Sequence, residues 1–124
     1  MKAIYLNVLE GEFPHIVEIK DDLKTYYELL KCDTIDIVTR TIQGKNFSVV
    51  CDDEGLFVEK PIVSAIDKNK KCQFVGNLLF CGMPTDEGEM TSLTEDEIKT
   101  ILSNLYIVFD SKTKKHFIIG NVEF

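Results

Sequence analysis

The stretch TSLTEDEIKTIL, residues 91–102, contains the clearest local structural signal in this chain. Thr94 is a suitable N-cap residue, and Glu97 stands three positions later, where its side chain can complete a capping box. Apolar residues at the two staple positions flank this box, and further apolar residues follow at helical spacing. The pattern therefore predicts a helix over about residues 95–105.

The residues after this helix are typical of a β-hairpin. Two short runs rich in β-branched and aromatic residues, 106–109 and 116–119, enclose the polar stretch 110–115. We therefore expect a C-terminal hairpin within residues 106–124.

A second helix is expected nearer the N-terminus. Asp21 and Asp22 stand where an N-cap and a first-turn acid belong, and apolar residues recur at helical spacing after them. This pattern predicts a helix over about residues 22–31, with Tyr26 and Tyr27 among its apolar positions.

Most of the remaining chain has the composition of strands. Alternating or continuous apolar runs predict strands at residues 2–9, 15–20, 35–40, 47–51 and 73–81. Polar turns are expected at residues 43–46 and 52–55. Residues 56–58 fit a continuation of the ladder, whereas residues 59–71 fit either a short helix or an extended segment. Strands with two separated helices indicate one α+β domain over residues 1–124, built mainly on an antiparallel sheet.

The charge balance argues against nucleic acid as a direct partner. Fourteen basic residues against twenty-one acidic ones give a net charge of −7, which opposes contact with phosphate backbones. No apolar run approaches the roughly 20 residues that span a bilayer, and the N-terminal sequence turns acidic before a signal-peptide core develops. We therefore expect a cytoplasmic protein without a membrane partner.

The cysteines lack the spacing of a metal or redox motif. None forms a CxxC pair, and all lie in or beside apolar stretches: Cys32, Cys51, Cys72 and Cys81. We expect reduced thiols that pack as small hydrophobic residues.

Established catalytic motifs are missing from the sequence. It contains no GxGxxG, GxxxxGK[ST], HExxH or GxSxG, and both histidines, His15 and His116, fall in expected strands. The acids within residues 52–54 do not have the spacing of an EF-hand loop. We therefore expect no catalytic residue, no metal site and no cofactor.

One acidic segment is a candidate partner-binding surface. Residues 86–97 carry many carboxylates and no basic side chain, and the candidate contact residues are Asp86, Glu87, Glu89, Glu95 and Asp96. Acids in the first turn of a helix also complement its dipole, and acids in a loop are solvated in any case. A structural explanation of these residues therefore competes with the functional one.

The chain also resembles a family of small domains of unknown function from phages, conjugative elements and Gram-positive bacterial genomes. The resemblance covers roughly residues 1–105 and rests on the order of the segments MKAIYLNV, VEIKDDLKTYYELL, TIDIV, VVCDDEGLF, QFVGNLLFCG and TSLTEDEIKTIL. It implies a mobile-element or accessory setting, and no established activity comes with it. The hairpin expected within 106–124 lies outside it.

Three interpretations of function follow. The first is a non-catalytic accessory module of a phage or mobile element that binds another protein, with the acidic residues as a possible contact. The alternative is a small-ligand or nucleotide-binding domain, with its pocket between the sheet and the helix that carries Tyr26 and Tyr27. The third is a small enzyme built on carboxylates and tyrosines. Exposed strand edges also make a homodimer an open expectation.

Overall fold

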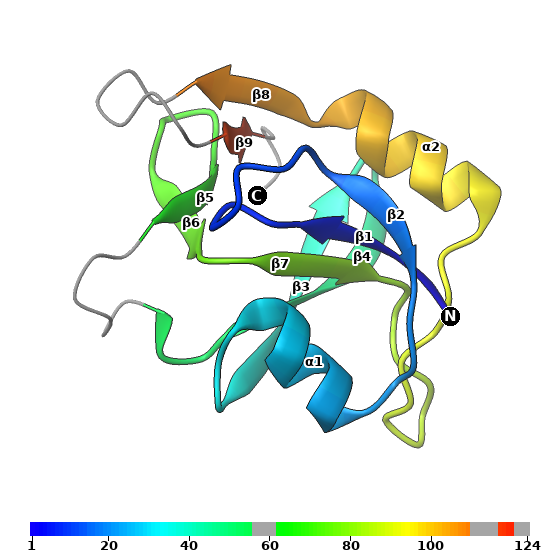
Figure 1. Cartoon of the computed structure of the whole chain (residues 1–124). Coiled ribbons are helices and arrows are strands. Elements are labelled where there is room, and N and C mark those ends of the chain that lie inside the picture. Colours follow the sequence, from blue (N-terminus) through cyan, green and yellow to red (C-terminus); the bar gives the residue numbers. More distant parts are fainter. Residues whose placement is uncertain (56–61, 110–116, 121–124) are drawn as a thin grey trace.

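The computed structural model of the chain describes residues 1–55, 62–109 and 117–120 (Figure 1). Within these residues the chain forms two helices and nine strands, so the expected α+β fold is confirmed. In chain order the elements are β1 (Lys2–Leu6), β2 (His15–Glu18), α1 (Leu23–Leu30), β3 (Ile35–Ile42), β4 (Lys45–Asp52), β5 (Val63–Ile66), β6 (Cys72–Val75), β7 (Leu78–Cys81), α2 (Glu95–Asn104), β8 (Tyr106–Phe109) and β9 (Phe117–Gly120).

The larger sheet is antiparallel, and its strands lie in the order β2-β1-β7-β4-β3. β1 and β2 form the expected N-terminal hairpin, in which Ile4 pairs with Ile16. β3 and β4 form a longer hairpin, which reverses at Gln43 and Gly44 inside the turn expected there. β7 lies between β1 and β4, so it joins the two hairpins into one sheet.

The smaller sheet has the order β6-β5-β9-β8. β8 and β9 pair antiparallel, which confirms the expected C-terminal hairpin. The turn expected at residues 110–115 lies outside the described residues, as does His116. β9 runs parallel to β5 and places Ile119 beside Ala65. The hairpin therefore supplies two of the four strands of this sheet and is an integral part of the domain.

The structure divides the strand expected over residues 73–81. β6 and β7 belong to different sheets, and the chain turns between them at Gly76 and Asn77. Gly76 has a φ of +76°, which glycine adopts without the steric cost of a Cβ atom. The fully buried Asn77 side chain donates hydrogen bonds to Tyr5 Oη at 3.2 Å and to Leu29 O at 3.0 Å. Asn77 therefore lies between β6 and β7, outside both strands, and its side-chain hydrogen bonds hold it in place.

The segment left open between helix and strand contains a strand followed by a turn where the structure describes it. β5 occupies Val63–Ile66, and Asp67 then begins a turn that leads to β6. The continuation of the ladder expected at residues 56–58 lies outside the described residues.

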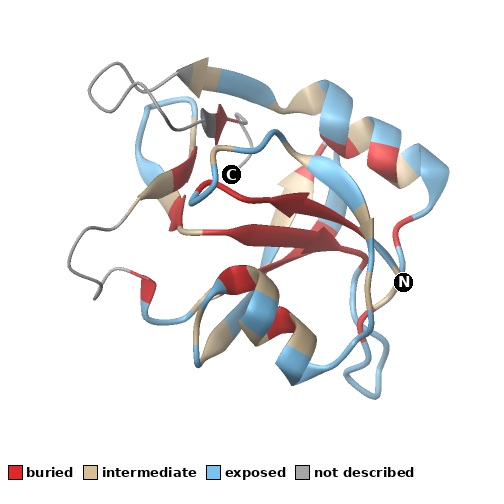
Figure 2. Ribbon diagram, in the orientation of Figure 1, coloured by how far each residue is buried: buried red, intermediate tan, exposed pale blue. Residues whose placement is uncertain are grey.

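The larger sheet is covered on both faces, so the domain has three layers (Figures 1 and 2). Side chains alternate along each strand: Leu78 and Phe80 of β7 face one core, whereas Leu79 faces the other. The first core also contains Ile98 and Ile101 of α2 and Ile119 of β9, so α2 and the smaller sheet cover that face. The second core contains Tyr26 and Leu30, so α1 covers the opposite face.

The cap of α2 is the predicted one, whereas α1 begins one residue later than predicted, with Asp22 as its N-cap and no acid in its first turn. Asp22 accepts a hydrogen bond from the Thr25 N–H at 2.8 Å at the start of α1. At α2, Thr94 Oγ1 accepts from the Glu97 N–H at 3.1 Å, and Glu97 Oε1 accepts from the Thr94 N–H at 3.0 Å, which completes the capping box. Among the described residues, neither helix has the length and apolar character needed to cross a membrane.

All four cysteines are free thiols, but they do not share one environment. Cys51 and Cys81 are buried, as expected of small hydrophobic residues, and Cys32 is half-buried. Cys72 is exposed, which corrects the expectation for that residue, because it begins β6 at the edge of the smaller sheet.

Candidate functional site

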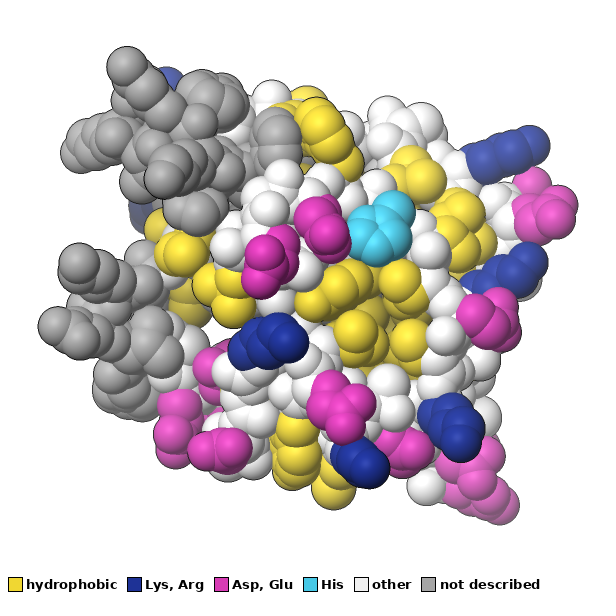
Figure 3. Space-filling model, in the orientation of Figure 1, with side chains coloured by type: hydrophobic (Ala, Val, Ile, Leu, Met, Phe, Trp, Pro, Cys, Tyr) yellow, Lys and Arg dark blue, Asp and Glu magenta, His cyan; other side chains and the backbone are white. Residues whose placement is uncertain are grey.

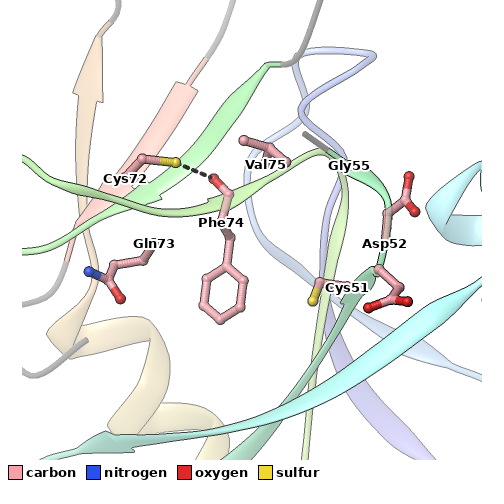
Figure 4. Close-up of a pocket in the computed structure, with 8 residues that line it drawn as sticks. Cys51, Asp52, Gly55, Cys72, Gln73, Phe74 and Val75 are labelled. Carbon is pink, nitrogen blue, oxygen red and sulfur yellow. Dashed lines mark hydrogen bonds between the residues drawn. The ribbon is translucent and has the colours of Figure 1, made fainter. Parts of the chain in front are cut away.

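A cleft of about 380 Å³ opens where the end of β4 faces β6, between the two sheets (Figure 4). The end of β4 and the turn after it form one wall, and β6 forms the other. The lining is mainly apolar, and its described residues are Cys51, Asp52, Asp53, Gly55, Cys72, Gln73, Phe74 and Val75.

The turn after β4 meets β6 at very close range. Gly55 is buried, and a Cβ atom built on it would lie 2.6 Å from Val75 Cγ2. No side chain fits at that distance unless Val75 moves, so glycine permits this approach. Asp52 stabilises the same turn by accepting the Glu54 N–H at 2.9 Å. These contacts fix the position of one wall of the cleft relative to the other.

Phe74 is the largest apolar group of the lining, and its ring points into the space between Gln73 and Cys51 (Figure 4). The guanidinium carbon of Arg40, on β3, lies 4.9 Å from the centroid of this ring, at cation–π distance. Arg40 Nη2 also lies 3.5 Å from Gln73 Oε1, and Gln73 Nε2 donates to Asp67 Oδ2 at 3.2 Å. Phe74 and Gln73 are therefore held by side chains that lie outside the lining.

Two lining residues are thiols, and the pKa of each is raised above its ordinary value. The pKa of Cys51 is raised to about 11, first by burial and then by the nearby Asp36 carboxylate. Partial desolvation of its sulfur also raises the pKa of Cys72, although the residue as a whole is exposed. Because the thiolate is the nucleophilic form, neither cysteine is a strong nucleophile near neutral pH. The cleft therefore offers a shape and hydrogen-bonding groups rather than an activated nucleophile.

A smaller cavity of about 80 Å³ lies on the other side of the same turn. It shares Asp52 and Gly55 with the cleft and also touches Lys31 and Gly76. A cavity of this volume holds at most a few water molecules. Within the described residues, no group of three or more His, Cys, Asp and Glu side chains is arranged to hold a metal ion.

The acidic residues identified in the sequence are all exposed, but they lie on two separate elements. Asp86, Glu87 and Glu89 occupy a loop closed by the pairing of Gly82 with Thr91. Glu95 and Asp96 form the first turn of α2 instead, and Figure 1 shows that turn well separated from the tip of the loop.

The acidic loop is hydrogen-bonded to the residues just before α1. Asp21 Oδ2 accepts the Met90 N–H at 2.9 Å, and the Met90 side chain is buried in the core beneath α1. Within the loop, Thr85 N–H donates to Glu89 O at 2.8 Å. The loop therefore presents its carboxylates from a defined backbone.

The two tyrosines suggested as a ligand pocket line neither cavity described above. Tyr26 is buried in the core under α1, and its hydroxyl donates to Asp21. Tyr27 is half-buried on the same helix. Figure 3 shows this side of the molecule, where apolar side chains gather around the helix and the neighbouring strands and charged groups of both signs surround them.

Only one of the two walls of the cleft has a distinct signal in the sequence. The sequence predicts residues 52–55 only as a turn, and it predicts Gln73, Phe74 and Val75 as part of one buried strand over residues 73–81. The two walls are separated along the chain by β5 and meet only because β6 joins the second sheet. Gly76 is the local signal that could have suggested this break.

The model of a protein family described as a domain of unknown function, DUF3846, matches residues 1–106. The matched region contains both walls of the cleft and ends at the first residue of β8. No curated protein and no solved structure matches this chain. Because the family match covers most of the sequence, the chain belongs to the DUF3846 family of domains of unknown function.

Proposed function

We propose that this domain is a non-catalytic binding module and that the cleft between β4 and β6 is its ligand site. The observation that carries the proposal is the cleft itself, a cavity of about 380 Å³ with a mainly apolar lining and carboxylates among its residues. Sites for small molecules usually have volumes of roughly 300–1,000 Å³ and combine apolar walls with a few polar groups. The raised pKa values of the Cys51 and Cys72 thiols favour binding over nucleophilic catalysis by either cysteine.

A thermal-shift screen with small molecules tests this proposal. A ligand that binds the folded state alone raises the melting temperature as its concentration rises above its Kd. Cys72→Phe should abolish the shift, because it places a bulky ring at the open edge of the cleft. Lys68→Phe is the matched control, since it adds the same ring to an exposed residue of the preceding turn, outside the lining. If no compound stabilises the natural protein more than it stabilises Cys72→Phe, the proposal fails.

Docking on another protein through the acidic loop is the second candidate function. It is favoured by one observation, the fixed and exposed presentation of Asp86, Glu87 and Glu89 by the bonds that close their loop. Such a surface would attract a basic partner. The same proposal includes the setting implied by the sequence resemblance, an accessory module of a phage or mobile element that acts in the cytoplasm.

A pull-down from the native host tests the acidic loop. The combined change Asp86→Asn, Glu87→Gln and Glu89→Gln should lose a partner that the natural protein retains, without a lower melting temperature. A control with the same change in charge neutralises exposed acids elsewhere, namely Glu10→Gln, Glu28→Gln and Asp33→Asn. Equal capture by both variants would exclude the loop as the contact.

A homodimer through the edge of β3 is disfavoured by local hydrogen bonds. β3 is an edge strand of the larger sheet. The Asp53 N–H, just after β4, donates to Thr34 O, so even-numbered residues of β3 bond to β4. Odd-numbered residues of β3 therefore direct their backbone N–H and C=O groups away from the sheet. Asp36 Oδ1 already accepts the Ile37 N–H at 2.9 Å, and Arg40 Nη1 donates to Thr39 O at 3.0 Å. A second strand would have to displace these side chains before pairing.

A further inference from the structure

β2 is the other edge strand of the larger sheet, which Figure 1 views from the side of β2, with β3 and β4 in the distance. Just beyond β2, the Ile19 N–H donates to Met1 O at 2.9 Å, and the Met1 amine donates to Ile19 O at 2.6 Å. Because bonded and non-bonded pairs alternate in an antiparallel ladder, odd-numbered residues of β2 bond to β1. Ile16 and Glu18 therefore direct their backbone N–H and C=O groups away from the sheet.

These outward groups lack the side-chain hydrogen bonds that protect the edge of β3. Among the described residues, no hydrogen bond engages the backbone N–H or C=O of Ile16 or Glu18. The side chains nearby bond elsewhere, since the Glu18 carboxylate lies 3.4 Å from the Met1 amine and His15 Nδ1 lies 2.9 Å from Phe13 O. The edge of β2 therefore presents unpaired donors and acceptors to which another strand can bond.

Apolar surface accompanies these backbone groups on both faces of β2. Ile16 is 52% exposed, although Ile4, its cross-strand partner, is fully buried in the first core. On the other face, Val17 and Ile19 pack against the second core but are only partly buried. Figure 3 shows apolar side chains gathered on this side of the molecule. A strand added beside β2 would remove part of this surface from water.

A second copy of β2 has the matching backbone groups and charges. A two-fold axis at Val17 places Ile16 of one copy opposite Glu18 of the other, so that each of the two pairs exchanges both of its backbone hydrogen bonds. Val17 then packs against Val17 of the other copy. The charges suit this register, because each Glu18 faces an apolar side chain instead of a second carboxylate and has the Met1 amine beside it.

We propose that two copies of this chain pair antiparallel through β2, about a two-fold axis at Val17, and so join their larger sheets into one continuous sheet. The strand order places β2 at one edge and β4, a wall of the cleft, toward the other. The two clefts of the dimer therefore lie on opposite sides of the axis, away from the contact. A dimer of this kind offers two identical sites and binds a partner with two linked ligand groups more tightly than a monomer does.

Sedimentation equilibrium of the full chain measures the dimer and its Kd, and amide hydrogen exchange in nitrogen-15-labelled protein locates the contact. The amides of Ile16 and Glu18 should exchange about tenfold more slowly above the Kd than below it. The outward amide of Thr39 on β3 is the internal control and should exchange at one rate throughout. A chain that stays monomeric up to about 1 mM, or a dimer that leaves both amides of β2 unprotected, would overturn the proposal.

Charge substitutions test the register. Ile16→Glu places a carboxylate opposite Glu18 of the other copy, and because this happens twice per dimer, the Kd should rise by about tenfold or more. Addition of Glu18→Lys makes the facing charges opposite and should return the Kd to within about threefold of the natural value. Ile37→Glu is the matched control, since Ile37 is exposed on the other edge strand, and it should leave the Kd unchanged. Equal effects of Ile16→Glu and Ile37→Glu, or no recovery in the double variant, would show that β2 does not pair with its own copy in this way.

Discussion

Replacement of Ile119 by alanine tests whether the C-terminal hairpin belongs to the core of the domain. Ile119 is fully buried among residues of both sheets and α2, although it lies beyond the region that the family model matches. The change removes three carbon atoms, at about 0.8 kcal/mol each, or roughly 2.4 kcal/mol of lost transfer free energy. The cavity left behind adds to this loss, so the free energy of unfolding should fall by about 3–5 kcal/mol.

Urea denaturation followed by circular dichroism measures this change, since the chain has no tryptophan for fluorescence. Ile107→Ala is the matched control, because Ile107 pairs directly with Ile119 across the hairpin but is 43% exposed. Its replacement should cost about 1 kcal/mol or less, because part of its surface is already in water. If both variants lose the same small amount of stability, then β9 does not contribute to the core as described.

Three further changes test local features. Thr94→Ala should reduce the free energy of unfolding by about 1 kcal/mol in urea titrations, because it removes one half of the capping box of α2, and an unchanged midpoint would count against that cap. Gly55→Ala should destabilise the domain by roughly 1–3 kcal/mol, because its Cβ would overlap Val75, and a melting temperature equal to that of the natural protein would argue against the close contact. Stability should also fall as the pH rises above 9, the ordinary pKa of a thiol, because Cys51 and Cys81 ionise freely only in the unfolded chain, whereas burial holds their pKa values at about 11 and about 12 in the fold. Replacement of both by valine should reduce this loss in denaturation curves recorded between pH 8 and pH 10, whereas above pH 10 the raised pKa values of Tyr5 and Tyr26 add a loss of their own.

The parts of the fold that local sequence determines were predictable. The capping box at Thr94 specifies where α2 begins, and the acids at residues 21 and 22 place the start of α1 to within one residue, because the bonds involved join residues only three positions apart. The hairpins follow in the same way, since alternating apolar residues on both sides of a short polar turn favour antiparallel pairing of neighbours.

The arrangement of the two sheets was not predictable from such patterns. The run from residue 73 to residue 81 is apolar apart from Gln73, Gly76 and Asn77, and the chain passes from one sheet to the other at Gly76 and Asn77. The parallel pairing of β5 with β9 joins residues more than fifty positions apart, and no local periodicity encodes it. Both halves of the run are buried, and Phe74 of β6 lies in the same core as Leu78 and Phe80 of β7, so composition could not reveal that the halves pair with different strands.

The candidate site could not be predicted from the sequence for the same reason. Asp52 and Gly55 have a strong turn signature, which hides their second role as one wall of a cleft. Phe74 has the signature of a core residue, which it also is, and its contact with Arg40 joins two strands of different sheets. The acidic residues are conspicuous in the sequence, but the fold separates those of the loop from those of α2.

The most direct test of the account is a titration of the full chain, labelled with nitrogen-15, with the compound that most raises its melting temperature in the thermal-shift screen as the probe, while amide chemical shifts are recorded. If the cleft is the ligand site, the largest saturable shifts should fall on residues 51–55 and 72–75 and should disappear in Cys72→Phe but not in Lys68→Phe. Shifts that are largest in the acidic loop or on α1, or that persist unchanged in Cys72→Phe, would show that the cleft between β4 and β6 is not where this domain binds the probe.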